Sequence, residues 1–305
     1  MPGRLQARLL VCALGVIGMV YAIPGGAASS PTPESYTQEI AAWRARRAER
    51  LRAEDGWLTL VGLFWLEPGP NAVGSASGNR VVFPEGKAPA FVGSLTRNGE
   101  FVTFHGAPGA GVTSEGKPVT TLPLSSDRAE SPTVLQLGSL SFYVIQRGER
   151  VGVRVKDSQS EARRRFHGIE TFPTDPRWRV EARFEPYEPP RSISVPNVLG
   201  SVDSESCPGA LVFEIEGKSY RLDPVLEKGE TDYFLIFGDR TNGAETYGAG
   251  RFLYAPPPVN GRTVLDFNKA YNPPCVFTPY ATCPLPPAQN KLPIRIEAGE
   301  KAYAH

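Results

Sequence analysis

The chain has 305 residues, of which 41% are hydrophobic and 21% charged, and its formal net charge is +1. This composition is typical of a globular protein and argues against a disordered chain or a membrane-helix bundle. The nearly balanced charge argues against nucleic acid as a partner. The 31 glycines and 30 prolines indicate many turns between short segments, which predicts a mainly β fold.

The first residues are typical of an export signal. Arg4 and Arg8 precede an uncharged apolar run from Leu9 to Ala22, and small residues follow it. We interpret residues 1–28 as a signal peptide, cleaved after Ala22 or Ala28. An uncleaved anchor is the less favoured alternative, because the run is short for a transmembrane helix. The mature protein is therefore expected to be periplasmic or extracellular, without a transmembrane span.

Residues 29–66 are expected to hold a linker, an N-terminal helix and an apolar connector. The helix is predicted over Tyr36–Asp55, with Thr32 as a possible cap and Pro33 in the first position. Gly56 ends it. Its arginines form either a solvated face balanced by glutamates, which we favour, or a surface for anionic lipid or a partner. The stretch that ends at Leu66 is predicted to dock the helix onto the body.

Two β-rich lobes are predicted after this connector. Residues 67–150 contain short apolar runs separated by Gly, Pro or Asn, a pattern typical of a β-sandwich. Residues 151–305 continue with further strands and end in a proline-rich segment, residues 272–293. Proline is excluded from central strands and helix interiors, so this segment is predicted to be clamped over the second lobe as a lid.

The order of runs in the first lobe resembles a forkhead-associated sandwich. The shared features are a turn at Gly74, a strand ending at Pro84, a GKPV hairpin and a Leu-Gly before the last strand. Members of that family read phosphothreonine through a Gly-Arg and a Ser-x-x-His. Here Ser75 follows Gly74, and PAFVG stands in place of the second motif. The resemblance thus implies the sandwich fold without phosphopeptide reading.

Three cysteines remain after residue 28. In an oxidising compartment Cys275 and Cys283 are the natural disulfide pair, and Cys207 is then left as a small buried residue. Neither the spacing nor a neighbouring histidine supports zinc. GxSxG, HExxH, Walker and Rossmann motifs are missing from the sequence. No metal and no cofactor is therefore expected.

The candidate site is a polar set around two expected strands, Arg251–Tyr254 and Thr263–Phe267, beneath the lid. We expect Glu245, Arg251, Asp266 and Asn268 to approach one another there. Arg251 is expected to pair with Glu245 or Asp266. The full set is Glu245, Tyr247, Arg251, Asp266, Asn268, Tyr271 and Asn272.

Three interpretations of this set stay open. In the first, Arg251, Asn268, Asn272 and Tyr247 bind a polar ligand, such as a glycan, or an envelope partner, and the protein is not catalytic. In the second, Glu245 and Asp266 are the acid and base of a hydrolase. In the third, these side chains only satisfy the backbone of the irregular lid. For this set of side chains we favour the third interpretation. For the protein as a whole we favour a non-catalytic binding protein, with the hydrolase as the alternative.

Three strings in the sequence resemble one family over about Tyr36 to Glu300. They are GWLTLVGLFWLEPG, RVKDSQSEARRRFHGIETFPTDPRWRVEARFEPY, and the stretch from ETYGAGRFLYA to CPLPPAQNKLPIRIEAGE. Together they are similar to the proteins grouped as domain of unknown function 1684. That family has no agreed activity, so the resemblance implies neither a substrate nor a site residue.

Overall fold

The computed structural model describes residues 32–227 and 229–303. The predicted signal peptide, residues 1–28, lies outside them. Within the described residues the one long helix is α1 (Pro33–Arg52), and α2 (Glu161–Arg164) is a single turn beside many strands. The predicted mainly β fold with an N-terminal helix is confirmed. The helix begins at Pro33, the residue predicted for its first position, and ends at Arg52, three residues before the predicted Asp55.

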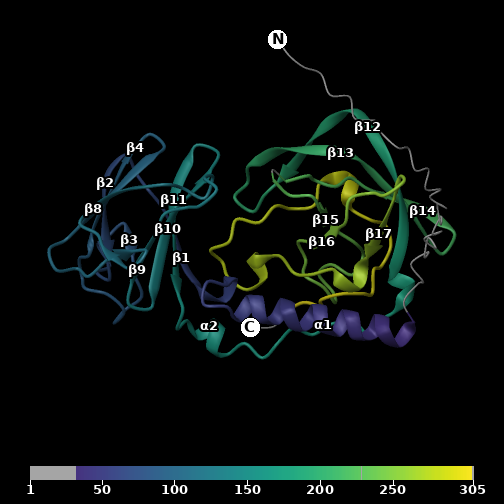
Figure 1. Ribbon diagram of the computed structural model, residues 1–305, viewed down its shortest axis with the longest axis horizontal. Helices are drawn as coiled ribbons and strands as arrows, with labels where there is room; N and C mark the ends of the chain where they lie inside the picture. The colour runs from purple at the N-terminus through teal and green to yellow at the C-terminus, as the bar shows by residue number, and fades with distance from the viewer. Residues whose placement is uncertain (1–31, 228, 304–305) are drawn as a thin grey trace, which may run out of the picture. The chain divides into compact units, whose positions relative to one another are not determined.

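Two sheets form the first lobe (Figure 1), and their strand pairs are antiparallel except for the parallel pair β2–β3. One has the strand order β3-β2-β4-β5-β8 and the other β1-β11-β10-β9-β6-β7. The first sheet contains β2 (Gly69–Gly74), β3 (Val81–Val82), β4 (Gly93–Asn98), β5 (Phe101–Gly106) and β8 (Thr121–Leu124). The second contains β1 (Leu60–Trp65), β6 (Thr113–Ser114), β7 (Lys117–Pro118), β9 (Val134–Leu137), β10 (Leu140–Arg147) and β11 (Arg150–Asp157).

A core of aromatic and aliphatic side chains joins these two sheets. Phe142 of β10 contacts Phe83 and Phe104, with ring centroids 5.1 and 6.1 Å apart. The buried residues of this core extend from Leu66 to Val155. The first lobe therefore includes β1 and β11, which lie outside the predicted range 67–150.

Strand β11 presents two chemically different faces. Val151, Val153 and Val155 are buried in the core of the first lobe. Because successive side chains of a strand point to opposite faces, Arg154 and Lys156 project away from that core. This alternation supplies the cations of the site described below.

The second lobe is built from a four-stranded antiparallel sheet and a hairpin. The sheet has the order β14-β13-β12-β17, and β15 pairs with β16. Its core includes Phe267, which contacts Phe213 and Phe237 at centroid distances of 5.7 and 5.5 Å. The strands are β12 (Arg179–Pro196), β13 (Val202–Ile215), β14 (Lys218–Leu222), β15 (Tyr233–Phe237), β16 (Arg251–Ala255) and β17 (Arg262–Asp266).

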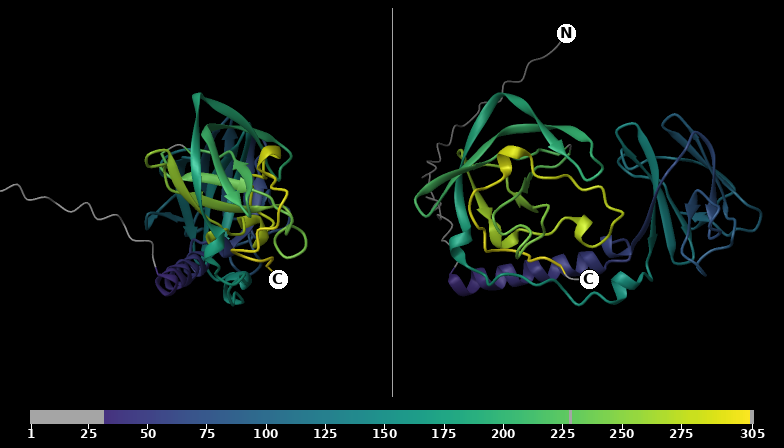
Figure 2. Two further views of the ribbon diagram at one scale, coloured as in Figure 1. Left: turned by 90° about the vertical axis from the view of Figure 1, so that its right-hand side faces the viewer. Right: turned by 180° about the vertical axis from the view of Figure 1, so that it is seen from behind.

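The proline-rich segment has no regular strand and packs on the second lobe through side-chain hydrogen bonds. Asn290 Oδ1 accepts a hydrogen bond from the backbone amide of Asp223 at 2.8 Å. Asn290 Nδ2 donates to the backbone carbonyls of Asp223 and Ile236. Helix α1 runs along this lobe beside the last part of the chain, as the rear view in Figure 2 shows. No helix in the described part of the chain combines the length and hydropathy that a membrane crossing requires.

Candidate functional site

Arg251 is fully buried and holds the end of the chain in place. Its Nη2 lies 2.8 Å from Asp239 Oδ2 and donates to the carbonyl of Ile296 at 2.8 Å, while Nη1 donates to the carbonyl of Ala298. The partner of Arg251 is thus Asp239, and not Glu245 or Asp266 as expected. Asp239 lies in a loop and is held there by Thr241. Its Oδ1 accepts hydrogen bonds from the amide and the hydroxyl of Thr241.

Asp266 and Asn268 belong to a second network, which anchors helix α1. The hydroxyl of Tyr36 donates to Asp266 Oδ1 at 2.8 Å and accepts from Asn268 Nδ2 at 2.9 Å. Burial raises the pKa of Tyr36, and the hydrogen bond to Asp266 adds to the rise. The proximity of Asp266 and Asn268 was predicted, but the helix that covers them was not part of that prediction.

The remaining predicted residues lie in other contacts. Glu245 pairs with Arg295 at the surface. Asn272 donates through Nδ2 to the carbonyl of Lys301 at 2.7 Å, and its amide donates to Glu300 Oε2 at 2.7 Å. Tyr247 is half-buried against an apolar cluster. The structure therefore places the predicted set in several anchoring networks, and of that set only Tyr271 lines either cavity described below.

Cys275 and Cys283 face each other as free thiols, so the predicted disulfide is not formed in this structure. The amide of Cys275 donates to Cys283 Sγ at 3.1 Å, and the amide of Cys283 donates to Cys275 Sγ at 3.4 Å. Cys207 is free and buried in a different place. Its burial raises the pKa of the thiol to about 11.

A cavity of about 780 Å³ lies between the two lobes and the C-terminal half of α1. We refer to it as the interlobe cavity. Its lining is strongly biased towards positive charge and aromatic rings. The cations are Arg47, Arg50, Arg147, Arg154, Lys156 and Lys269, and the carboxylates are Asp55 and Glu227.

Three of these cations have carboxylate partners within ion-pair distance. Arg47 pairs with the buried Glu300 at 3.2 Å. Arg147 and Lys269 are paired in the same way, with Asp127 at 2.8 Å and with Glu39 at 2.5 Å. Their charges are therefore largely balanced within the protein.

Arg154 differs from them, because it is only 5% exposed and pairs with no carboxylate of the described residues. Its Nη2 donates to Thr282 Oγ1 at 3.0 Å, and its guanidinium lies 5.1 Å from the ring centre of Trp57. Its Nε is buried without a hydrogen-bond partner. A buried donor without a partner costs free energy, and this one belongs to a residue of the cavity wall.

Two neighbours of Arg154 extend the positive region. Arg147 Nε also donates to Thr282 Oγ1, at 3.1 Å, so one neutral hydroxyl lies between two guanidinium groups. Lys156 donates to the carbonyl of Asp55 and lies over the ring of Tyr143. Burial lowers the pKa of Lys156; the proximity of Asp55 raises it in part, and the proximity of Arg154 lowers it again. An anion beside Lys156 would oppose this lowering.

Aromatic side chains form a further wall of the interlobe cavity. Tyr271 and Tyr254 are nearly parallel, with an interplanar angle of 14° and centroids 6.3 Å apart. Phe252 meets Tyr271 edge-on, and Tyr254 stacks on Phe234. Tyr254 is 41% exposed, so this wall begins at the surface and offers apolar contact area inside it.

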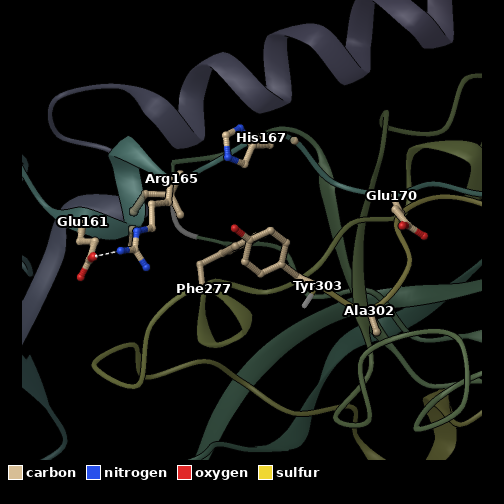
Figure 3. A pocket seen from close by; sticks show the side chains of 10 residues that line it. Glu161, Arg165, His167, Glu170, Phe277, Ala302 and Tyr303 are labelled. Carbon is tan, nitrogen blue, oxygen red and sulfur yellow. Dashed lines mark ion pairs between the residues drawn. The ribbon is translucent and has the colours of Figure 1, made fainter. Parts of the chain in front are cut away.

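A second cavity, of about 860 Å³, lies beside α2 (Figure 3). Phe277 and Tyr303 pack together in it, with centroids 5.1 Å apart. Its charged groups are exposed, and Arg165 pairs with Glu161 at 2.6 Å. No residue of this lining combines burial with an unpaired charge. It therefore offers a ligand less than the interlobe cavity does.

Arg154, Lys156 and Thr282 were not among the residues predicted for the site. The signal was the run RVGVRVKD, in which the valines predict a buried face and the same alternation places cations opposite them. The packing of the two lobes determines which residues cover the face of β11 that carries these cations. The spacing of residues in the sequence does not predict that packing.

Comparisons with known proteins bear on the second part of the chain. Residues 164–301 match the family model described as "Protein of unknown function (DUF1684)". This is the C-terminal part of the resemblance noted from the sequence; the match does not include the first lobe, whose likeness to a forkhead-associated domain stays a prediction. The solution NMR structure of an uncharacterized protein from Haloarcula marismortui is 31% identical, covering 46% of this chain and 78% of that one, with a TM-score of 0.39. No curated protein matches the chain.

Proposed function

We propose that this protein, whose residues 164–301 match a family of unknown function, is a binding protein for a small anionic molecule that occupies the interlobe cavity. The observation that carries the proposal is the buried, unpaired charge of Arg154 in the cavity wall. This keeps the non-catalytic, polar-ligand interpretation of the sequence but moves the site from the lid anchors to the interlobe cavity.

The energetics favour an anion. Removing a guanidinium from water costs several kcal/mol unless an opposite charge and hydrogen bonds compensate it. Arg154 has one neutral acceptor, Thr282, and the face of Trp57. A carboxylate or phosphate oxygen would bond the free Nε and balance the charge. Lys156 is the second cation within the same wall.

The rest of the lining indicates the remainder of the ligand. The wall of Tyr254, Tyr271 and Phe252 supplies apolar contact area, and the volume of the cavity suits a small organic molecule. We therefore propose an organic acid or phosphate ester with an apolar part as the ligand class. The hydrolase alternative receives no such support, because neither Glu245 nor Asp266 lines this cavity.

The proposal is tested with Arg154→Met and the matched control Arg150→Met. Both residues lie on β11 and both changes remove one positive charge, but Arg150 lies over Trp65 outside the cavity. Titration calorimetry with phenyl phosphate and benzoate as probes should show binding to the wild type and to Arg150→Met. Arg154→Met should lose about tenfold or more in affinity, the value of a charge-assisted hydrogen bond.

Two results would count against the proposal. One is a wild-type protein that binds neither probe at millimolar concentration. The other is equal affinity in the wild type and in Arg154→Met. Unfolding in urea tests whether the variants are folded. Because Arg154 has no counter-ion within the described part of the protein, Arg154→Met should not lower the free energy of unfolding substantially.

We also propose that the protein is exported. The support is the basic start at Arg4 and Arg8, the apolar run and the small residues after it. Mass spectrometry of the protein recovered outside the cytoplasmic membrane should show an N-terminus between Ile23 and Thr32. Recovery of a chain that still begins at Met1 would show that the segment is not removed.

A further inference from the structure

The cysteine pair lies at the interlobe cavity. Cys283 lines the cavity and is 4% exposed, whereas Cys275 is half-buried. Each sulfur accepts a hydrogen bond from the backbone amide of the other cysteine. Such reciprocal contacts hold both sulfurs in place without a covalent bond.

The chain between these cysteines carries the hydroxyl that contacts both arginines. Thr282 immediately precedes Cys283, and its Oγ1 accepts from Arg147 and Arg154. Thr278, in the same segment, donates to the carbonyl of Leu60 in β1 at 3.1 Å. Segment 275–283 thus contacts the first lobe through Thr278 and Thr282.

We propose that Cys275 and Cys283 are a reversible dithiol–disulfide site, and that the disulfide fixes segment 275–283 and Thr282 in the cavity wall. The closed loop is short, and a covalent bond across it restricts its motions more than the present hydrogen bonds do. In the disulfide form, Thr282 is fixed and its hydroxyl keeps the guanidinium of Arg154 in one orientation. The Nε of Arg154 stays available to the ligand.

The reaction uses a small-molecule or protein disulfide as oxidant. The Cys275 thiolate attacks one sulfur of that disulfide, forms a mixed disulfide and releases one thiolate. The Cys283 thiolate then attacks Cys275 Sγ, forms the internal disulfide and releases the second thiolate. The protein loses two protons and two electrons, and the oxidant gains two electrons. The hydrogen bond from Cys283 lowers the pKa of Cys275, which suits Cys275 to the first attack.

The consequence for ligand affinity rests on the proposed function. When segment 275–283 is already fixed in its binding geometry, less conformational entropy is lost on binding. The oxidised protein should therefore bind an anion more tightly. We expect a factor of about fivefold or more, the lower end of usual coupling between sites. By reciprocity the ligand should lower the reduction potential of the pair, by about 20 mV for a factor of five.

The experiment equilibrates the purified protein in glutathione buffers of different oxidation state. Acid quenching, alkylation and peptide mapping should recover the Cys275–Cys283 disulfide in the oxidising buffer and both alkylated thiols in the reducing one. Hydrogen exchange of residues 275–283 should be slower in the oxidised protein. Phenyl phosphate should bind about fivefold more tightly to it, and the Cys275→Ser/Cys283→Ser variant should lose this redox dependence. Cys207→Ser is the control that retains it.

The outcomes separate the two proposals. If both thiols remain alkylatable in oxidised glutathione, or if exchange of residues 275–283 is the same in both states, the disulfide lock is wrong. If the lock forms but phenyl phosphate binds equally well to both states, the coupling is wrong and the proposed function stands. If neither state binds phenyl phosphate, the proposed function and the coupling fail together, while mapping and exchange still decide the lock.

Discussion

Arg251 lies entirely inside the second lobe, where Asp239 balances its charge and its Nη1 and Nη2 donate to the backbone carbonyls of Ala298 and Ile296. Breaking such a buried pair leaves an uncompensated carboxylate and several carbonyls without donors. We expect Arg251→Met to lower the free energy of unfolding by about 3–5 kcal/mol. Urea denaturation followed by circular dichroism measures this free energy of unfolding.

The matched control for this change is Arg262→Met. Arg262 pairs with Glu181, but both side chains are more than half exposed. An exposed ion pair contributes less than about 1 kcal/mol, so this variant should unfold nearly like the wild type. Similar losses in the two variants would show that burial does not determine the contribution of Arg251.

Helix α1 depends on polar contacts as well as on its apolar face. Arg47 is buried, pairs with Glu300 at 3.2 Å and donates to the carbonyl of Asn272 at 2.9 Å. Removing it leaves Glu300 buried without its partner, so Arg47→Met should destabilise the protein by about 3–5 kcal/mol. Hydrogen exchange should also speed up along α1. The control Arg46→Met lies on the same helix, with an exposed side chain, and should change neither measurement.

Local rules predicted some elements and not their partners. Pro33 and Gly56 marked the region of the helix, and alternating valines marked β11, because both signals depend on neighbouring residues. The ion pair of Arg251 was predicted with the wrong partners. Asp239 pairs with Arg251 because Asp239 lies in a turn that hydrogen bonds to Thr241 hold in shape. Spacing along the chain does not show which of several carboxylates such a turn places beside an arginine.

The candidate site was harder to predict because it forms only when both lobes are in place. Arg154 and Thr282 are far apart in sequence, and neither belongs to a motif. The polar set predicted from the second lobe instead serves to attach α1 and the end of the chain. An irregular, proline-rich segment must satisfy its backbone through side chains, so polar residues concentrate there without forming a ligand site.

A ligand in the interlobe cavity would contact both lobes and should therefore stabilise the whole fold. Ligand that binds only the native state adds about 2.7 kcal/mol at a hundred times its Kd. For a chain of this length, that raises the Tm by about 5 °C. Scanning calorimetry with saturating phenyl phosphate should show this rise in the wild type and in Arg150→Met.

The same scan distinguishes the interlobe cavity from binding elsewhere. At the phenyl phosphate concentration that saturates the wild type, Arg154→Met should show at most about half of this rise, because it lacks the group that pairs with the anion and binds at least about tenfold more weakly. Added salt should reduce the wild-type rise only partly, since salt screens a buried charge less than an exposed one. An equal rise in Arg154→Met would place the bound anion at another surface. A rise abolished by moderate salt would indicate an exposed cation in place of the buried Arg154.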